Sequence, residues 1–78
     1  AQNKVQSFLQ QAAQSEKAGN LDEAISIYLQ ILQVFPDMAS VYNNLGTNYF
    51  ELQQYDKAIF ALEKSIALNP QDEKTYFN

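Results

Sequence analysis

The chain has 78 residues, of which 46% are hydrophobic and 18% charged, and its formal net charge is −4 at pH 7. This composition predicts one small folded domain and excludes a highly charged disordered chain. The five basic residues are lysines scattered singly, so no basic stripe is present to neutralise phosphates, and we expect neither nucleic acid nor a membrane as a partner.

Apolar residues in the first half of the chain follow the three-and-four spacing that is typical of amphipathic helices. One run covers residues 5–12 and a second covers residues 21–32, with Gly19-Asn20 between them. Glycine and asparagine favour a tight turn. The pattern therefore predicts a helix, a turn and a second helix.

The residues around this turn also predict how the helices begin and end. Gly19 can take the left-handed conformation that ends the first helix. Asn20 is expected to cap the second helix, with Glu23 reaching back toward it as in a capping box. The second helix should stop before Pro36, because proline restricts the preceding residue, and Asp37 is expected to cap the third helix or to favour its positive end.

The second half of the chain repeats this scheme. Apolar periodicity covers residues 41–52 and then residues 55–68, and Asn69-Pro70 closes the unit. Gly46 stands inside a predicted helix, where glycine costs about 1 kcal/mol relative to alanine. We therefore expect the paired helix to approach Gly46 closely, with Ala58 as the small residue opposite.

The two halves are similar with a period of 34 residues and no insertion. Four identities carry the period: Asp22, Ala24, Ile25 and Pro36 recur as Asp56, Ala58, Ile59 and Pro70. By the same period, Ala12 and Ala24 should form the close helix crossing in the first half. Self-similarity of this length is typical of helical repeat proteins, in which each unit covers the apolar face of its neighbour.

These residues resemble the tetratricopeptide repeat. The second repeat, residues 39–72, follows the family pattern at Tyr42, Leu45-Gly46, Tyr49, Tyr55, Ala58, Leu62, Ser65 and Pro70. The first repeat, residues 5–38, follows it at Phe8, Ala12, Leu21, Ala24, Tyr28 and Pro36, but has Ile31 where a small residue is common. Residues 73–78 look like the start of a third repeat. The resemblance implies an all-α domain over residues 1–78, in which antiparallel helix-turn-helix repeats stack as a right-handed superhelix.

The resemblance also implies a concave groove, lined by the first helix of each repeat, that binds peptides. The candidate partner-binding residues on that side are Leu9, Gln10, Asn43, Asn44, Thr47, Phe50, Lys74 and Phe77. Amides can bond a peptide backbone, while the apolar members can receive its side chains. Phe50 could instead stack on a neighbouring helix, and Phe77 could cover the open end. The other repeat-position aromatics, Tyr55 among them, are expected in the packed core.

The chain offers little for catalysis. It contains no cysteine and no histidine, so the usual nucleophiles, general bases and soft metal ligands are missing. The acidic pairs Asp22-Glu23 and Asp72-Glu73 stand near predicted helix starts, where they favour the helix dipole. No calcium-loop pattern or phosphate-binding glycine loop occurs. We expect no enzymatic activity, no metal and no cofactor.

Taken together, these observations predict a protein–protein interaction scaffold that is part of a longer repeat protein. One alternative is a self-association unit acting through the uncovered helix at residues 55–68 or through the Tyr76-Phe77 end. Another is a regulatory appendage of an enzyme whose catalytic domain lies outside this chain. No apolar run approaches the roughly 20 residues that span a bilayer, so a soluble chain is expected. We expect a cytoplasmic location.

Overall fold

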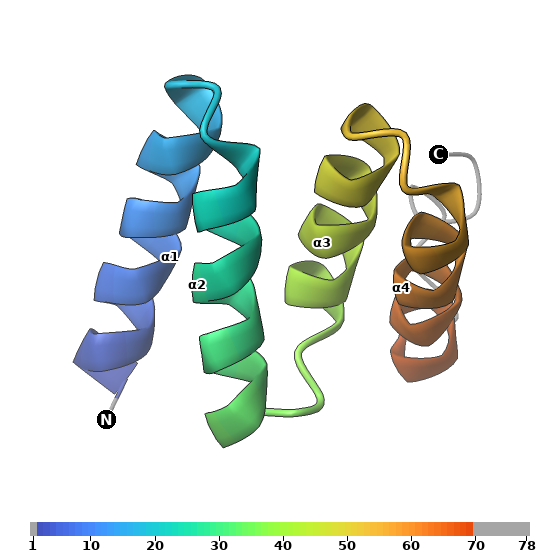
Figure 1. Ribbon diagram of the computed structural model, residues 1–78. Helices are drawn as coiled ribbons and strands as arrows, with labels where there is room; N and C mark the ends of the chain where they lie inside the picture. The colour runs from blue at the N-terminus through green and yellow to red at the C-terminus, as the bar shows by residue number, and fades with distance from the viewer. Residues whose placement is uncertain (1, 70–78) are drawn as a thin grey trace. The chain divides into compact units, whose positions relative to one another are not determined.

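The computed structural model describes residues 2–69, and the side chains of residues 4–69. This part of the chain is helical throughout, with short turns and without a β-strand. Its four helices are α1 (Gln2–Lys17), α2 (Leu21–Val34), α3 (Ala39–Glu51) and α4 (Tyr55–Leu68) (Figure 1). The all-α prediction is therefore confirmed.

The chain divides into two compact units, and the boundary lies between Pro36 and Asp37. We call residues 2–36 the first hairpin and residues 37–69 the second hairpin. In each hairpin two helices lie side by side and antiparallel (Figure 1). The predicted start of a third repeat, at residues 73–78, lies outside the described residues, and the single-domain assignment stays a prediction.

The turn of the first hairpin forms as the sequence predicts. Gly19 has a φ of +84°, in the left-handed region that favours glycine. The Asn20 N–H donates to the Ser15 carbonyl at 2.8 Å, and the Gly19 N–H donates to the Glu16 carbonyl at 3.0 Å. These two bonds form a Schellman motif, which satisfies carbonyls at the end of α1.

The predicted capping box at the start of α2 is wrong. Asn20 stands at the N-cap position, but its side chain makes no capping hydrogen bond. Glu23 instead accepts a hydrogen bond from the Ser15 hydroxyl at 2.8 Å. The reason lies in the turn, because the backbone N–H that a capping glutamate would bind already donates to Ser15.

The connection to the second hairpin confirms one expectation and corrects another. α2 ends at Val34, before Pro36, as predicted. The N-cap of α3 is Met38 rather than Asp37, and Met38 has no oxygen side chain with which to cap. Asp37 therefore stands one residue outside the cap position, where its charge can favour the helix dipole without a direct hydrogen bond.

The close crossing predicted at Gly46 is confirmed. A Cβ atom placed on Gly46 would lie 2.6 Å from Cγ and 2.7 Å from Cδ2 of Leu62, and 3.3 Å from the Ala58 carbonyl oxygen. Any larger residue would therefore require the Leu62 side chain to move. In the first hairpin, Ala12 and Ala24 are both fully buried, as expected of the small residues at the equivalent crossing.

Candidate functional site

Three of the predicted binding residues share one face of α3. Asn43, Thr47 and Phe50 are separated by four and three residues, which places them on one side of the helix, and we call them the α3 stripe. The Thr47 hydroxyl donates to the Asn43 carbonyl at 3.1 Å. The side-chain oxygen of Asn43 is buried and has no hydrogen-bond partner among the described residues. The stripe therefore combines one buried acceptor with the exposed Thr47 and Phe50 side chains.

Phe50 ends the stripe as an exposed aromatic ring. It is 60% exposed, and its edge meets the Tyr55 ring with centroids 5.4 Å apart and planes at 64°. The alternative in which Phe50 packs on a neighbouring helix is thus observed, although most of the ring stays open. The core prediction for Tyr55 is wrong, because the residue is 50% exposed. Tyr55 is the first residue of α4, where its ring meets Phe50 across the turn.

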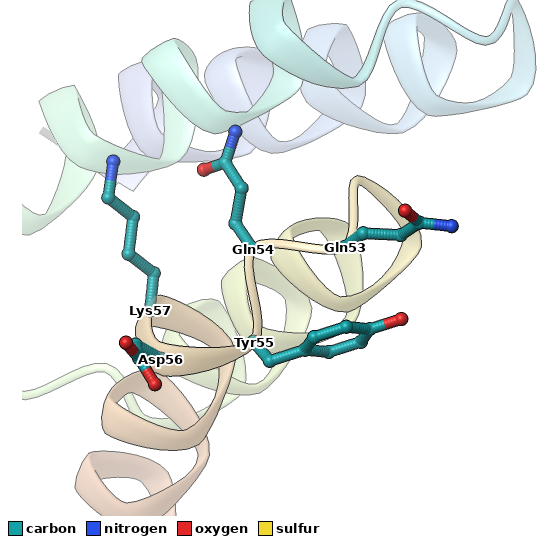
Figure 2. A pocket seen from close by; sticks show the side chains of 5 residues that line it. All are labelled: Gln53, Gln54, Tyr55, Asp56 and Lys57. Carbon is teal, nitrogen blue, oxygen red and sulfur yellow. The ribbon is translucent and has the colours of Figure 1, made fainter.

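An open hollow of about 420 Å³ surrounds the α3–α4 turn, and Gln53, Gln54, Tyr55, Asp56 and Lys57 line it. The Gln54 and Lys57 side chains extend to one side of the turn and the Tyr55 ring to the other (Figure 2). All five residues are exposed. Exposed amides and one charge of each sign suit hydrogen bonding to another molecule better than acid–base chemistry, which benefits from a site sheltered from water.

The remaining predicted residues are spread along the chain. Asn44 is half-buried on α3, next to the stripe. On α1 of the first hairpin, Leu9 is half-buried and Gln10 is exposed. Lys74 and Phe77 lie outside the described residues. The structure therefore groups the α3 residues with one another, while the assembly of all eight into one groove stays a prediction.

Side-chain interactions that join the two helices of each hairpin were not expected from the sequence. In the first hairpin the Ser15 hydroxyl bonds Glu23, and the Tyr28 hydroxyl donates to the Glu16 carboxylate at 3.1 Å. Both bonds use a carboxylate as the acceptor, Glu23 on α2 in the first and Glu16 on α1 in the second. Sequence reasoning treated Glu23 only as a capping residue, and so missed its partner on α1.

The second hairpin joins its helices with lysine and tyrosine instead. The Lys57 ammonium lies 5.7 Å from the centroid of the Tyr49 ring, and the Lys64 ammonium lies 6.0 Å from that of Tyr42. Both distances suit a cation–π interaction. The matching seven-residue spacing of the lysines on α4 and of the tyrosines on α3 is the signal that could have revealed the two pairs.

Two further classes of site find no support in the described part of the chain. Across residues 2–69, no three His, Cys, Asp or Glu side chains come together in a way that could hold a metal ion. None of the four described helices is long and apolar enough to cross a membrane.

Three relatives are similar to most of the chain. Tetratricopeptide repeat protein 28 from Homo sapiens is 37% identical over 73 residues, covering 90% of this chain. The BBSome complex member BBS4 homolog from Drosophila melanogaster is 33% identical over 63 residues, or 81% of this chain. A probable UDP-N-acetylglucosamine--peptide N-acetylglucosaminyltransferase SPINDLY from Oryza sativa subsp. japonica is 40% identical over 53 residues, or 68% of this chain.

The chain spans only 3%, 13% and 6% of the lengths of these three relatives, respectively. The similarity therefore concerns a module within much longer proteins. The profile of the tetratricopeptide repeat matches residues 5–71, which is most of the chain. Repeats of this kind generally mediate contacts between proteins and are not themselves catalytic. With the helical hairpins and the 34-residue period, this match shows that the chain belongs to the tetratricopeptide repeat family.

Proposed function

We propose that this chain binds an extended or helical segment of a partner protein along the α3 stripe. The observation that carries the proposal is the exposed Phe50 ring on the same face as the exposed Thr47 hydroxyl. An apolar side chain of a bound peptide would cover Phe50, while the Thr47 oxygen would accept a hydrogen bond from the peptide backbone.

The spacing within the stripe suits a short peptide. Asn43 and Phe50 are seven residues apart, which corresponds to about 10 Å along the helix axis. An extended peptide covers that distance with about three residues. Between the two ends, Thr47 presents a methyl group and an oxygen that can still accept, because its hydrogen is directed at the Asn43 carbonyl.

The other predicted residues are proposed as further contacts with the partner protein. Asn44 would supply a second amide beside the stripe. Leu9 and Gln10 are candidates on α1 of the first hairpin, and Lys74 and Phe77 stay candidates outside the described residues. The Drosophila relative is named as a member of the BBSome complex, and the human relative as a tetratricopeptide repeat protein. Their lengths support a role for this chain as one module of a longer scaffold.

The test begins with a displayed library of random peptides selected on the 78-residue chain. The affinity of a selected peptide is then measured by fluorescence anisotropy for the unmodified chain, for Phe50→Glu and for Phe60→Glu. We expect Phe50→Glu to weaken binding by about 30-fold or more, as loss of an interface anchor does. Phe60 is the matched control, because it is 63% exposed on α4 and lies off the stripe.

Circular dichroism separates binding from folding in this experiment. Both variants replace exposed rings, so both should retain helical spectra and similar melting temperatures. The α3 proposal fails if Phe50→Glu binds as tightly as the unmodified chain, or if the two variants lose affinity equally.

Asn43→Ala gives a second test with a distinctive signature. Removing a buried acceptor that lacks a partner should leave stability unchanged or slightly higher, and alanine is also the better helix former. Peptide affinity should nevertheless fall, because the peptide loses its contact with the half-buried Asn43 side chain on the stripe. A variant that loses stability and affinity together would instead assign Asn43 to packing.

A second candidate function is a recruiting or regulatory module attached to an enzyme. The observation that favours it is the similarity to the SPINDLY proteins of Oryza sativa and Hordeum vulgare, which are named as probable glycosyltransferases. Sequencing the complete reading frame around these 78 residues tests it. A catalytic domain in the same frame would support this candidate, and a frame made only of repeats would exclude it.

A further inference from the structure

The first hairpin carries an apolar pocket between its two helices. The pocket has a volume of about 230 Å³, and its apolar lining comes from Val5 and Phe8 on α1, from Ile31 and Val34 on α2, and from Phe35 just after α2. Lys4 is exposed and is the only charged residue among those described as lining it. We call this the α1–α2 pocket. Small-molecule sites are usually larger, about 300–1,000 Å³, so this pocket suits a single side chain.

The same positions carry different side chains in the second hairpin. Ser65 stands 34 residues after Ile31, and its hydroxyl donates to the Ala39 carbonyl at 2.9 Å, which ties α4 to the start of α3. Lys64, the counterpart of Gln30, lies over the Tyr42 ring. In the first hairpin Ile31 is bulkier than serine and has no hydroxyl to make such a bond. The α1–α2 pocket is therefore lined by side chains that the second hairpin does not repeat.

The outer side of α4 carries an aromatic residue between two acids. Phe60 is 63% exposed, and Asp56 and Glu63 lie four residues before it and three after it, on the same helical face. We call these three residues the Phe60 face. Within residues 2–69 neither acid forms an ion pair. Lys57 and Lys64 are also near Phe60 in sequence, but their ammonium groups lie over tyrosine rings of α3.

We propose that the α1–α2 pocket of one copy of the chain receives the Phe60 ring of a second copy. The pocket supplies an apolar lining for an aromatic ring that is otherwise left in water. The charges are also complementary, because Lys4 of the first copy would face Asp56 and Glu63 of the second. An acidic face with one large apolar residue thus meets an apolar pocket with one cation.

This contact has a direction, because the pocket and the Phe60 face belong to different hairpins of the same chain. Such heterologous contacts join copies head to tail, and they close into rings or grow into chains. A contact centred on one side chain is small, so the association should be weak and reversible. The inference is independent of the proposed peptide binding, because neither surface includes the α3 stripe.

Sedimentation velocity of the 78-residue chain, from about 10 μM to about 1 mM, tests the proposal. We expect the average mass to rise above that of the monomer as the concentration rises. Phe60→Ser and Lys4→Glu should each weaken association, Phe60→Ser by about tenfold or more. Both residues are exposed, so the variants should fold, as circular dichroism would verify. A chain that stays monomeric throughout, or a Phe60→Ser variant that associates normally, would overturn the proposal.

A charge exchange provides the matched control for Lys4. A variant with Asp56→Lys and Glu63→Lys keeps its own pocket, which can receive the Phe60 face of either partner. Its exchanged face should be attracted only by the Lys4→Glu pocket, so we expect it to bind the Lys4→Glu variant more tightly than the unmodified chain. Equal affinity for both would show that these charges do not meet, and would contradict the proposed contact.

Mixing variants tests the head-to-tail direction. Phe60→Ser keeps the pocket, and Lys4→Glu keeps the Phe60 face, so an equimolar mixture should form one-to-one dimers that neither variant forms alone. Phe50→Glu should self-associate like the unmodified chain, which separates this proposal from peptide binding. If the chain is monomeric and a selected peptide loses affinity on Lys4→Glu alone, the pocket belongs to a partner protein, and self-association is overturned.

Discussion

The ammonium of Lys57 lies 5.7 Å from the centroid of the Tyr49 ring, at the repeat positions that Glu23 and Ser15 occupy in the first hairpin. One hairpin thus joins its helices with a cation and an aromatic ring, and the other with a hydroxyl and a carboxylate at 2.8 Å. The backbone repeat is the same, but the charged group is a carboxylate in the first hairpin and an ammonium in the second. Each hairpin therefore has its own determinants of stability.

The pairing of Lys57 with Tyr49 predicts a measurable coupling. In a double-mutant cycle of Lys57→Gln and Tyr49→Leu, we expect a coupling free energy of about 0.5–1 kcal/mol, as at exposed cation–π pairs. Urea denaturation of the four proteins measures it. The cycle of Lys57→Gln with Tyr42→Leu is the control, and it should be additive because Tyr42 pairs with Lys64. Equal coupling in both cycles would point to a general charge effect.

Gln53 predicts a stabilising substitution. It has a φ of +63°, at the position that Gly19 occupies one repeat earlier, and it completes a Schellman motif in which the Gln54 N–H donates to the Tyr49 carbonyl at 2.9 Å. The left-handed conformation costs a non-glycine residue about 1–2 kcal/mol. Glycine also raises the conformational entropy of the unfolded chain, which offsets part of this gain. Gln53→Gly should therefore raise the free energy of unfolding by about 0.5–1 kcal/mol.

The reciprocal variant serves as the control for Gln53. Gly19→Gln should lower stability by about 1 kcal/mol, because it introduces the same strain at a φ of +84°. Thermal melting should show opposite shifts, at about 4–8 °C per kcal/mol for a chain of this size. A lower melting temperature for Gln53→Gly would mean that the glutamine side chain contributes contacts that outweigh the strain.

The close crossing of α3 and α4 predicts that Ala58 tolerates no larger side chain. Ala58→Leu should destabilise by about 1–3 kcal/mol, because Ala58 is buried and its carbonyl oxygen lies near Gly46. Ala67→Leu is the matched control, since Ala67 is exposed on the same helix. An unchanged melting temperature for Ala58→Leu would refute the tight crossing.

The bond between Ser65 and Ala39 predicts a smaller effect. Ser65 is buried and donates to the Ala39 carbonyl at 2.9 Å, so Ser65→Ala should cost about 0.5–1.5 kcal/mol. Ser26→Ala, at an exposed position of α2, should have little effect beyond helix propensity. Chemical denaturation of both variants makes the comparison, and equal stabilities would show that the bond contributes nothing net.

Much of the candidate site could be anticipated from spacing. The placement of Asn43, Thr47 and Phe50 on one face follows from helical periodicity, and the exposed Phe50 ring agrees with the prediction. The partners of these groups could not be anticipated. The contact of Phe50 with Tyr55 depends on how the α3–α4 turn places its ends, and the burial of the Asn43 oxygen depends on what packs around α3.

The sequence by itself determined the features that depend on near neighbours along the chain. Helix periodicity, the glycine that ends α1 and the proline that follows α2 act within a few residues, so their signals are local. The close approach at Gly46 could also be predicted, because glycine lowers helix stability and its place inside a helix needs a packing reason. The left-handed conformation of Gln53 could also have been predicted, because the 34-residue period aligns Gln53 with Gly19.

Only the tertiary structure decided which side chains meet across each hairpin. Glu23 bonds Ser15 rather than capping α2, and Lys57 lies over Tyr49, because the axial offset of two packed helices selects the pairs. The lining of the α1–α2 pocket likewise depends on packing, which brings side chains of α1 and α2 together around it. Residue type sets which interactions are possible, whereas packing sets the distances over which short-range forces act.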